Sequence, residues 1–576
     1  MDYNNLLNLY KFKKFQEVLN IINKNPNPSS KELNLKGLIY FQQHQDQEAM
    51  SYFLEANKKD ENYCDPLINL GKIYFKNKNY IEAKECFLKA QKINLNLSIS
   101  DFFLAQIYFI TLKDFKKTEF HLLKAIDLDP LKNDYYLYLT SFYFNTSAYE
   151  KAINFAKKSY QLKKSYFLLK IIAQSYLKLN NVKESNSYYL EYLKYFPQDY
   201  ESYYAISLNH LFVNDRPNFW LNIKKCLNIN PKHSKSILTI SRLKEKEIIL
   251  DENKINEYFS TEKNQYIKAD YGFALFNINH NKNNFEKASH YVKHANNLIF
   301  KSLNQQLSYD AQEFNIYSKF FNNQFFKKRL SNPKEKKNES KPIFIVGLPR
   351  SGSTLLEGVL NHYSLIDSFG EIDYFYRAIE KYYNDLSLDK LDTKIKVSFK
   401  ENNPEAMIKN YYLELINCKN IFFTDKMLSN FRFIGFIKSC FPQARIIHCI
   451  RDRSDNLFSI YSNHLDSTIF PWMYDIKTLK DYYNSYVSLM SHWKNIFEDE
   501  IYDFHYERFV NNTDHEAKKL ISYLGIEWDE NCIKSVGKDE LVIKTASYDQ
   551  ARGTIYSNHL KQSENYKAYL GEIFTN

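Results

Sequence analysis

The feature that most constrains the fold is a set of small and large residues that recurs at a spacing of 34. The five positions carry the same residues in both copies, namely Gly37, Tyr40, Ala49, Phe53 and Ala56, then Gly71, Tyr74, Ala83, Phe87 and Ala90. Small side chains are needed where two helices approach closely, and aromatic rings fill the gaps between neighbouring helices. Each helix pair leaves an apolar face uncovered, so several pairs must stack.

This register resembles the tetratricopeptide repeat, a helix–turn–helix unit of about 34 residues. Less regular copies follow, with the marker residues Ala105, Tyr108, Thr118, Ala125, Pro130, then Tyr143, Ala152, Ala156, Ser159, then Ala173, Tyr176, Ser185, Tyr189, Tyr192, Pro197, and a degenerate copy ending at Cys226 and Pro231. We predict an all-α array over residues 1–330, with its clearest repeats at about 35–231. The concave face of such an array binds peptides or proteins. A rigid scaffold or a dimerisation surface is the alternative.

The composition agrees with helices and buried cores. Hydrophobic residues make up 44% of the 576 residues and aromatic residues 17%, which argues against wholesale disorder. With only 12 Gly and 13 Pro, collagen-like and turn-rich chains are excluded. The seven cysteines are scattered and form no CxxC pair, so neither a zinc ribbon nor a disulfide framework is indicated.

The net charge, the first residues and the apolar stretches give expectations about binding partners and cellular location. The net charge of +11 is dispersed and no RNA-binding motif occurs, so no nucleic-acid partner is expected. The first residues lack the basic and apolar regions of a secretory signal. No stretch approaches the roughly 18 uninterrupted apolar residues of a membrane span. We therefore expect a cytoplasmic protein without a membrane span.

A polar, charged segment at residues 331–340 is predicted to link the array to a second domain at 341–576. The apolar run at 342–346 is typical of a buried strand. The loop GLPRSGST at 347–354 follows, and residues 355–362 then have a helical pattern. Strand, glycine-containing loop and helix together predict an α/β domain with a phosphate-binding loop, because backbone N–H groups there point at an anion.

The loop nearly fits the GxxxxGK[ST] pattern, but Ser353 replaces the lysine that contacts β- and γ-phosphates. A basic residue, Arg350, appears inside the loop instead. An ATP or GTP hydrolase without the lysine would lose its main charge clamp. We expect the loop to hold a terminal phosphate of a different nucleotide, and a structural turn is the alternative.

A second predicted strand at residues 444–450 ends at Arg451 and precedes a predicted helix that carries Ser459. Open α/β sheets bind ligands at the carboxyl ends of their strands. Arg451 and Ser459 therefore predict a second phosphate site, which a nucleotide with two separate phosphates would occupy.

These segments resemble the sulfotransferase family. PIFIVGLPRSGSTLLE at 342–357 is similar to its 5′-phosphosulfate loop, and RIIHCIRDRSDNLFSIY at 445–461 to its 3′-phosphate segment. YERFV at 506–510, LGIEW at 524–528 and TASYDQAR at 545–552 resemble later family elements in the same order. The whole chain resembles bacterial tetratricopeptide-repeat sulfotransferases, and its second domain resembles protein-tyrosine sulfotransferases. The implied fold is a solenoid followed by a P-loop-like α/β domain with a parallel sheet.

The resemblance implies transfer of a sulfuryl group from 3′-phosphoadenosine 5′-phosphosulfate to an acceptor hydroxyl, without a metal. The acceptor would be a polypeptide or a glycan, with protein tyrosine preferred. The array would bind the acceptor or a protein partner. The implied donor-binding residues are Pro349, Arg350, Ser351, Gly352, Ser353, Thr354, Arg451, Ser459, Tyr506, Ser547, Arg552 and Lys561.

Three residues are predicted by this resemblance to carry the chemistry. Arg350 and Lys426 would stabilise the bridging oxygen, and Glu371 would take the acceptor proton. A carboxylate suits that role when desolvation raises its pKa. The alternatives are a purely binding role for Arg350, a surface position for Lys426, and a helix-start carboxylate at Glu371.

The closing segment departs from the family pattern. Lys561-Gln562-Ser563 stands where a glycine, a basic residue and a tryptophan are usual, and Gly553-Thr554 stands where Gln-Pro is usual. An interaction scaffold with a nucleotide-binding but weakly active domain is therefore the alternative from another class. A kinase would use the same loop, but Ser353 and the Arg451–Ser459 pair argue against it.

Overall fold

The structure, a computed structural model, describes residues 3–112, 114–243, 247–303, 309–329, 341–383, 388–401, 403–416, 418–534 and 560–575. The chain divides into two compact units, Met1–Phe196 and Pro197–Asn576. The predicted linker at 331–340 lies outside the described residues, so the domain boundaries at 330 and 341 stay predictions.

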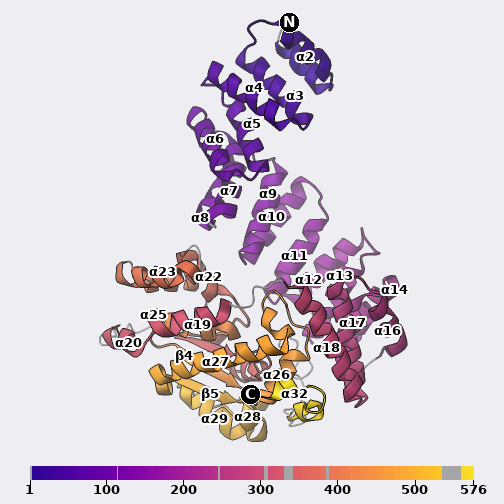
Figure 1. Ribbon diagram of the computed structural model, residues 1–576, viewed down its shortest axis with the longest axis vertical. Helices are drawn as coiled ribbons and strands as arrows, with labels where there is room; N and C mark the ends of the chain where they lie inside the picture. Colours follow the sequence, from indigo (N-terminus) through magenta and orange to yellow (C-terminus); the bar gives the residue numbers. More distant parts are fainter. Residues whose placement is uncertain are drawn as a thin grey trace. The chain divides into compact units, whose positions relative to one another are not determined.

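Unit 1 is built from consecutive pairs of helices, drawn from indigo to violet in Figure 1. Their bounds are α1 (Tyr3–Lys11), α2 (Phe15–Lys24), α3 (Ser30–Gln42), α4 (Asp46–Lys59), α5 (Asp65–Lys76), α6 (Tyr80–Ile93), α7 (Ser98–Leu112), α8 (Phe115–Leu128), α9 (Asn133–Asn145), α10 (Tyr149–Leu162), α11 (Phe167–Lys178) and α12 (Val182–Leu193).

The repeated small residues lie where the two helices of a pair touch. A Cβ atom on Gly37 would lie 2.6 Å from a ring carbon of Phe53, and one on Gly71 would lie 2.8 Å from a ring carbon of Phe87. Both distances are too short for a side chain, so these crossings require glycine. Ala83 of the same set is completely buried. The predicted solenoid packing is confirmed at these positions.

Unit 2 begins with further helices that continue the all-α pattern. Their bounds are α13 (Tyr200–Phe212), α14 (Arg216–Ile229), α15 (Ser234–Arg242), α16 (Glu252–Thr261), α17 (Gln265–Asn281), α18 (Phe285–Ser302), α19 (Tyr309–Phe320) and α20 (Asn323–Arg329).

An α/β part follows in the same unit. Its elements are β1 (Lys341–Gly347), α21 (Ser353–Leu360), β2 (Ile366–Ser368), α22 (Tyr374–Tyr383), α23 (Leu388–Glu401), α24 (Pro404–Ile416), β3 (Phe422–Asp425), η1 (Leu428–Phe433), α25 (Ile434–Cys440), β4 (Arg445–Ile450), α26 (Arg453–Tyr461), η2 (Pro471–Tyr474), α27 (Ile476–Phe497), η3 (Glu498–Glu500), β5 (Ile501–His505), α28 (Tyr506–Asn511), α29 (Thr513–Leu524), α30 (Asn531–Lys534), η5 (Gln562–Tyr566) and α32 (Gly571–Phe574).

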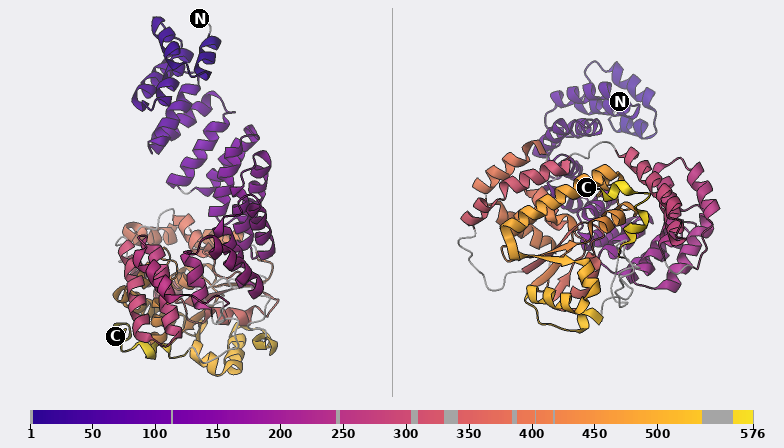
Figure 2. Two further views of the ribbon diagram at one scale, coloured as in Figure 1. Left: turned by 90° about the vertical axis from the view of Figure 1, so that its right-hand side faces the viewer. Right: turned by 60° about the horizontal axis from the view of Figure 1, so that its bottom comes forward.

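The strands form a five-stranded sheet in the order β2-β3-β1-β4-β5. Every pair is parallel, with Ile343 opposite Arg445 and Gly347 opposite Cys449 in the central pair. Helices cover both faces of the sheet (Figure 2). The predicted fold class, a helical solenoid followed by an α/β domain with a parallel sheet, is confirmed.

The residues of β1 alternate between two apolar cores. Ile343 and Ile345 pack toward α21 and α29, whereas Phe344 and Val346 belong to a larger core on the opposite face. That larger core also contains buried residues of the preceding helices, such as Phe273 of α17. The helices at the start of unit 2 and the sheet therefore share one hydrophobic core.

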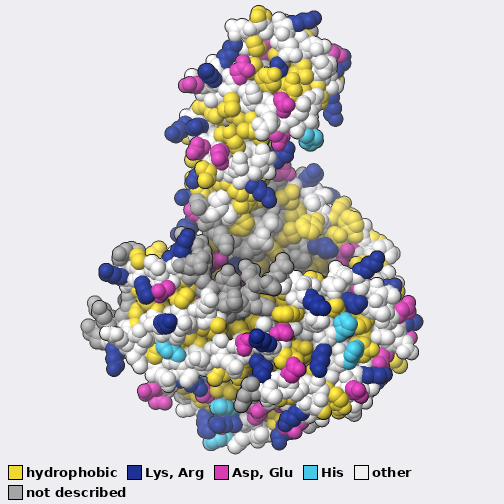
Figure 3. Space-filling model, viewed as in Figure 1, with side chains coloured by type: hydrophobic (Ala, Val, Ile, Leu, Met, Phe, Trp, Pro, Cys, Tyr) yellow, Lys and Arg dark blue, Asp and Glu magenta, His cyan; other side chains and the backbone are white. Residues whose placement is uncertain are grey.

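Lys and Arg side chains are interspersed with Asp and Glu on the face drawn in Figure 3. This agrees with the dispersed charge of the sequence. Among the helices of the described ranges, none combines the length and the apolar character needed to cross a membrane.

The repeat packing gives a direct stability test. Phe87 is fully buried and stacks on Phe103 with 5.0 Å between ring centroids, whereas Leu88 on the same helix is 37% exposed. We expect Phe87→Ala to lower the local free energy of unfolding by about 3–5 kcal/mol, because it leaves a cavity between three helices. Hydrogen exchange of α5–α7 in the full chain measures this. Leu88→Ala is the matched control, and an equal loss in both variants would contradict the assigned core.

Candidate active site

The loop between β1 and α21 approaches two neighbouring segments so closely that it requires glycine at both ends. Gly347 has φ +147°, and a Cβ atom there would lie 2.7 Å from the carbonyl oxygen of Cys449. Gly352 has φ +93°, and a Cβ atom there would lie 2.5 Å from the ring of Tyr506. α21 then begins at Ser353, so its first backbone N–H groups, which have no partner within the helix, lie at the loop. This is the geometry of an anion site.

The parallel sheet places the ends of all five strands at one edge. The loop at 348–354 follows β1, Glu371 follows β2, and Lys426 follows β3. Arg451 follows β4 and Tyr506 follows β5. Five distant segments that carry predicted site residues therefore meet at the edge where open α/β sheets bind ligands.

Lys426 is almost completely buried between two carboxylates. Its Nζ lies 2.7 Å from Oε2 of Glu357 and 3.7 Å from Oε1 of Glu371. Burial on its own lowers the pKa of Lys426, but the two carboxylates outweigh this effect and hold the pKa above its usual value. Lys426 is therefore a charged group in the interior and not a surface lysine.

The turn that carries Lys426 is anchored by the residue before it. Asp425 is fully buried and accepts hydrogen bonds from Tyr412 Oη at 2.9 Å and from Met427 N at 3.0 Å. Burial raises the pKa of Asp425 to about 7. On the other side, Lys426 N donates to the carbonyl oxygen of Gly370 at 2.9 Å. The chain just before Glu371 is thereby fixed to the end of β3.

Arg350, Ser459 and Arg451 meet at the other side of the loop. Arg350 Nε donates to Ser459 Oγ at 3.2 Å, and Arg451 Nη1 donates to the carbonyl oxygen of Arg350 at 3.1 Å. Burial, followed by the positive charges of Arg451 and Arg242, lowers the pKa of Arg350 to about 10. Arg350 has φ +67°, so its backbone adopts the left-handed conformation. The structure thus brings the loop arginine together with Arg451 and Ser459, the residues predicted for the second phosphate.

Tyr506 lies between the loop and Arg451. Its ring packs on Gly352, and the guanidinium of Arg451 lies 5.1 Å from the ring centroid. The neighbouring carboxylate of Glu507 accepts from Asp452 N at 2.9 Å, which ties the start of α28 to the end of β4. The role of Tyr506 beside an adenine stays a prediction.

The start of α26 holds both the loop and the closing segment. Asn456 Nδ2 donates to the carbonyl oxygen of Pro349 at 2.9 Å. The buried carboxylate of Asp455 accepts from Lys561 N at 2.6 Å and from Ser563 N at 3.0 Å. The Lys561 segment is therefore attached to the site through its backbone, while the Lys561 side chain is exposed.

Of the remaining predicted residues, Ser351 and Ser353 are buried in the loop, and Ser351 Oγ donates to the carbonyl oxygen of Leu348 at 2.7 Å. Thr354 is half-buried in the first turn of α21. Ser547 and Arg552 lie outside the described residues.

Three polar residues that support the site were not predicted from the sequence, namely Glu357, Asp455 and Asn456. Glu357 was visible as an acidic residue in the otherwise apolar stretch after the loop. Its partner Lys426 lies 69 positions away in the chain, and only the fold brings the two together. Asp455 and Asn456 carry no such signal.

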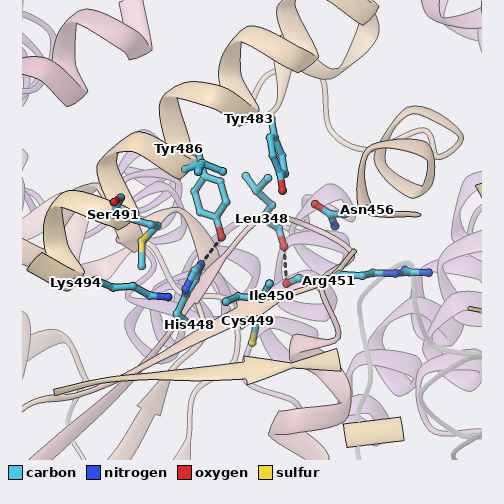
Figure 4. A pocket seen from close by; sticks show the side chains of 13 residues that line it. Leu348, His448, Cys449, Ile450, Arg451, Asn456, Tyr483, Tyr486, Ser491 and Lys494 are labelled. Carbon is cyan, nitrogen blue, oxygen red and sulfur yellow. Dashed lines mark hydrogen bonds between the residues drawn. The ribbon is translucent and has the colours of Figure 1, made fainter. Parts of the chain in front are cut away.

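A cavity of about 330 Å³ lies behind the loop, between β4 and α27. Its wall includes Leu348 of the loop and Tyr483 of α27 (Figure 4). His448 Nδ1 lies 3.0 Å from Oδ1 of Asp503, and Nε2 bonds the hydroxyl of Tyr486. Burial lowers the pKa of His448, and its two contacts join β4 to β5 and α27.

Comparison with known proteins agrees with this architecture. A profile of the Sulfotransferase family matches residues 342–530, and a Tetratricopeptide repeat profile matches residues 64–97. The chain thus combines a tetratricopeptide-repeat region with a sulfotransferase family domain, consistent with the tetratricopeptide-repeat sulfotransferases.

One curated relative is an uncharacterized protein of Aquifex aeolicus (strain VF5), 25% identical over 315 residues. The match covers 53% of this chain and 41% of that protein, so this chain spans about two fifths of the relative's length.

Solved structures similar to part of the chain include YrrB, a TPR protein with an unusual peptide-binding site. It is 13% identical, with a TM-score of 0.30, and the match covers 32% of this chain and 96% of YrrB. A MamA protein is 20% identical, with a TM-score of 0.27, over 29% of this chain and 90% of MamA.

The buried Lys426–Glu357 pair allows stability and turnover to be separated. We expect Lys426→Met to lower the free energy of unfolding by about 3–5 kcal/mol, because it leaves the Glu357 carboxylate buried without its cation. Adding Glu357→Gln should restore most of the stability but not catalytic turnover. Thermal melts and turnover of both variants measure this. Full turnover in the double variant would contradict a chemical role for Lys426.

Proposed function

We propose that this protein transfers a sulfuryl group from 3′-phosphoadenosine 5′-phosphosulfate to an acceptor hydroxyl. The observation that carries the proposal is the meeting of the glycine loop, Glu371, Lys426 and Arg451 at one sheet edge. This edge lies within the domain that matches the sulfotransferase family.

Two separate anion sites fit the two phosphates of this donor. The loop with the start of α21 would hold the 5′-phosphosulfate through backbone N–H groups. Arg451 and Ser459 would hold the 3′-phosphate, which ATP lacks. The 3.2 Å contact between Arg350 and Ser459 supports this division, because it places the loop arginine next to the second site.

The transfer step needs stabilisation of a leaving oxygen and removal of one proton. The acceptor hydroxyl oxygen forms a bond to sulfur, while the bond between sulfur and the bridging oxygen of the donor breaks. The electron pair stays on the 5′-phosphate of the departing nucleotide. Arg350 and Lys426 would stabilise this charge, and Glu371 would accept the hydroxyl proton.

The surroundings of Glu371 suit a proton acceptor that must reach an incoming substrate. Its side chain is 51% exposed, while its neighbour Lys426 is buried. Lys426 Nζ lies 3.7 Å from Oε1 of Glu371, so the cation and the proposed proton acceptor are neighbours. Glu371 also precedes α22 by three residues, so an interaction with that helix start remains the alternative role.

We further propose that the acceptor is a polypeptide, with tyrosine as the acceptor residue. The tetratricopeptide repeats support a protein-binding role, since stacked helix pairs form an extended concave surface. A glycan acceptor is the alternative within the same chemistry.

A second candidate function is an interaction scaffold whose nucleotide-binding domain is weakly active. One observation favours it. The Lys561 segment departs from the family pattern, and the structure attaches it through backbone hydrogen bonds to Asp455 while the Lys561 side chain is exposed.

Binding of the product nucleotide tests the donor site. We expect 3′,5′-adenosine bisphosphate at 100 times its dissociation constant to stabilise the full chain by about 2.7 kcal/mol. Arg451→Ala should remove the shift, whereas Arg453→Ala, which removes an equal charge two residues away, should keep it. Thermal melts measure both. A shift with Mg-ATP alone would favour a kinase, and no shift with either ligand would favour the scaffold.

The Glu371→Gln variant distinguishes an active enzyme from a scaffold that only binds the nucleotide. We expect a loss of about 10²- to 10⁴-fold in transfer to a tyrosine-containing peptide, with nucleotide binding retained, because only the proton acceptor is removed. Transfer from radiolabelled donor gives the readout. The exposed Glu414→Gln is the charge-matched control. Unchanged transfer in Glu371→Gln would exclude Glu371 as the base, and no transfer by the unaltered chain would contradict the tyrosine acceptor.

A further inference from the structure

Arg242, the last residue of α15, connects the helical part of unit 2 to the donor site. Its Nη2 donates to the carbonyl oxygen of His464 at 3.3 Å. His464 belongs to the loop at 462–470 that joins α26 to η2. α26 is the helix that carries Ser459, so Arg242 lies against the segment that directly follows the predicted 3′-phosphate ligand.

The helical part of unit 2 fixes this loop at several points. His464 Nδ1 lies 2.9 Å from Oδ1 of Asp270, and its ring stacks on Phe273 at 5.1 Å. The second oxygen of Asp270 accepts from Ser234 Oγ at 2.6 Å, at the other end of α15. Asn296 Nδ2 of α18 donates to the carbonyl oxygen at the end of α26 at 2.9 Å. The end of α26 is therefore held by three helices that precede the sheet.

Hydrogen bonds and the intervening backbone of residues 459–464 connect Arg242 to the loop arginine. Asn463 Nδ2, one residue before His464, donates to the carbonyl oxygen of Ser459 at 2.8 Å. Ser459 Oγ in turn accepts from Arg350. The charge of Arg242 also acts on Arg350 and, together with burial and Arg451, lowers its pKa. Arg242 and Arg350 are thus attached to the two ends of the same short segment, residues 459–464.

The charge of the expected ligand explains why a third arginine is useful there. A phosphate monoester carries about −1.5 to −2 charges at neutral pH. A single arginine neutralises only one of them, and Ser459 contributes none. In the closing segment, the side chain of Lys561 is exposed.

We propose that Arg242 binds the 3′-phosphate of the donor together with Arg451 and Ser459. The inference rests on the proposed function and extends it, because it makes the helical array part of the nucleotide site. The helical array then has two roles: it binds a partner or acceptor, and it supplies one residue of the nucleotide site.

Two nucleotides that differ only in the 3′-phosphate test this assignment in the full chain. Calorimetric titration with 3′,5′-adenosine bisphosphate and with adenosine 5′-monophosphate separates the 3′-phosphate from the rest of the ligand. We expect Arg242→Gln to weaken the bisphosphate by about 10- to 100-fold, as for a hydrogen bond to a charged group, and to leave the monophosphate within about twofold. Arg242→Lys should recover part of the loss. Lys235→Ala, on the exposed side of the same helix, is the control.

Three other outcomes of these titrations are possible. An equal loss for both nucleotides would show that Arg242 does not act on the 3′-phosphate, and would overturn the proposal. Unchanged bisphosphate binding in Arg242→Gln would also overturn it while leaving the proposed function intact. Failure of the unaltered chain to bind the bisphosphate would instead refute the proposed function itself. A thermal melt of each variant confirms that it is folded.

Discussion

The site depends on one constraint, the parallel order of the five strands. In a parallel sheet every strand ends at the same edge, and each connection must return over a face of the sheet. The order β2-β3-β1-β4-β5 puts β1 in the centre, so its glycine loop is flanked by the ends of β3 and β4. Lys426 and Arg451 lie at those two ends. A basic residue on each side of the glycine loop follows from this strand order.

The site also depends on the hydrophobic core that the sheet shares with the helices that precede it. Phe273 of α17 and Phe344 of β1 belong to the same buried cluster. Because a close-packed interior has little free volume, the position of one packed element fixes the positions of its neighbours. The helices that start unit 2 therefore set where α26 ends. In the proposed enzyme they set the place of Ser459, in addition to any role in binding a partner.

The sequence predicts more of the fold than of the candidate site. The repeat register at Gly37 and Gly71 identified the helix crossings, because a helix pair needs a small residue at the same place in every copy. The strand-loop-helix pattern identified the glycine loop, because its glycines are forced by close contacts with neighbouring segments. Glu357 and Arg242 were not identified. Their partners lie far away in the chain, and a single charged residue on a helix has no pattern of its own.

The sequence by itself determined the solenoid, the α/β domain, the glycine loop and the residues that follow the strands. These features depend on short-range periodicity and on local backbone geometry, which neighbouring residues encode. Only the tertiary structure decided that Lys426 is buried between Glu357 and Glu371. It also decided that Arg242 of the helical part hydrogen-bonds the loop that follows α26. The physical reason is that electrostatic interactions depend on distance in space, and the chain folds residues together that its order keeps apart.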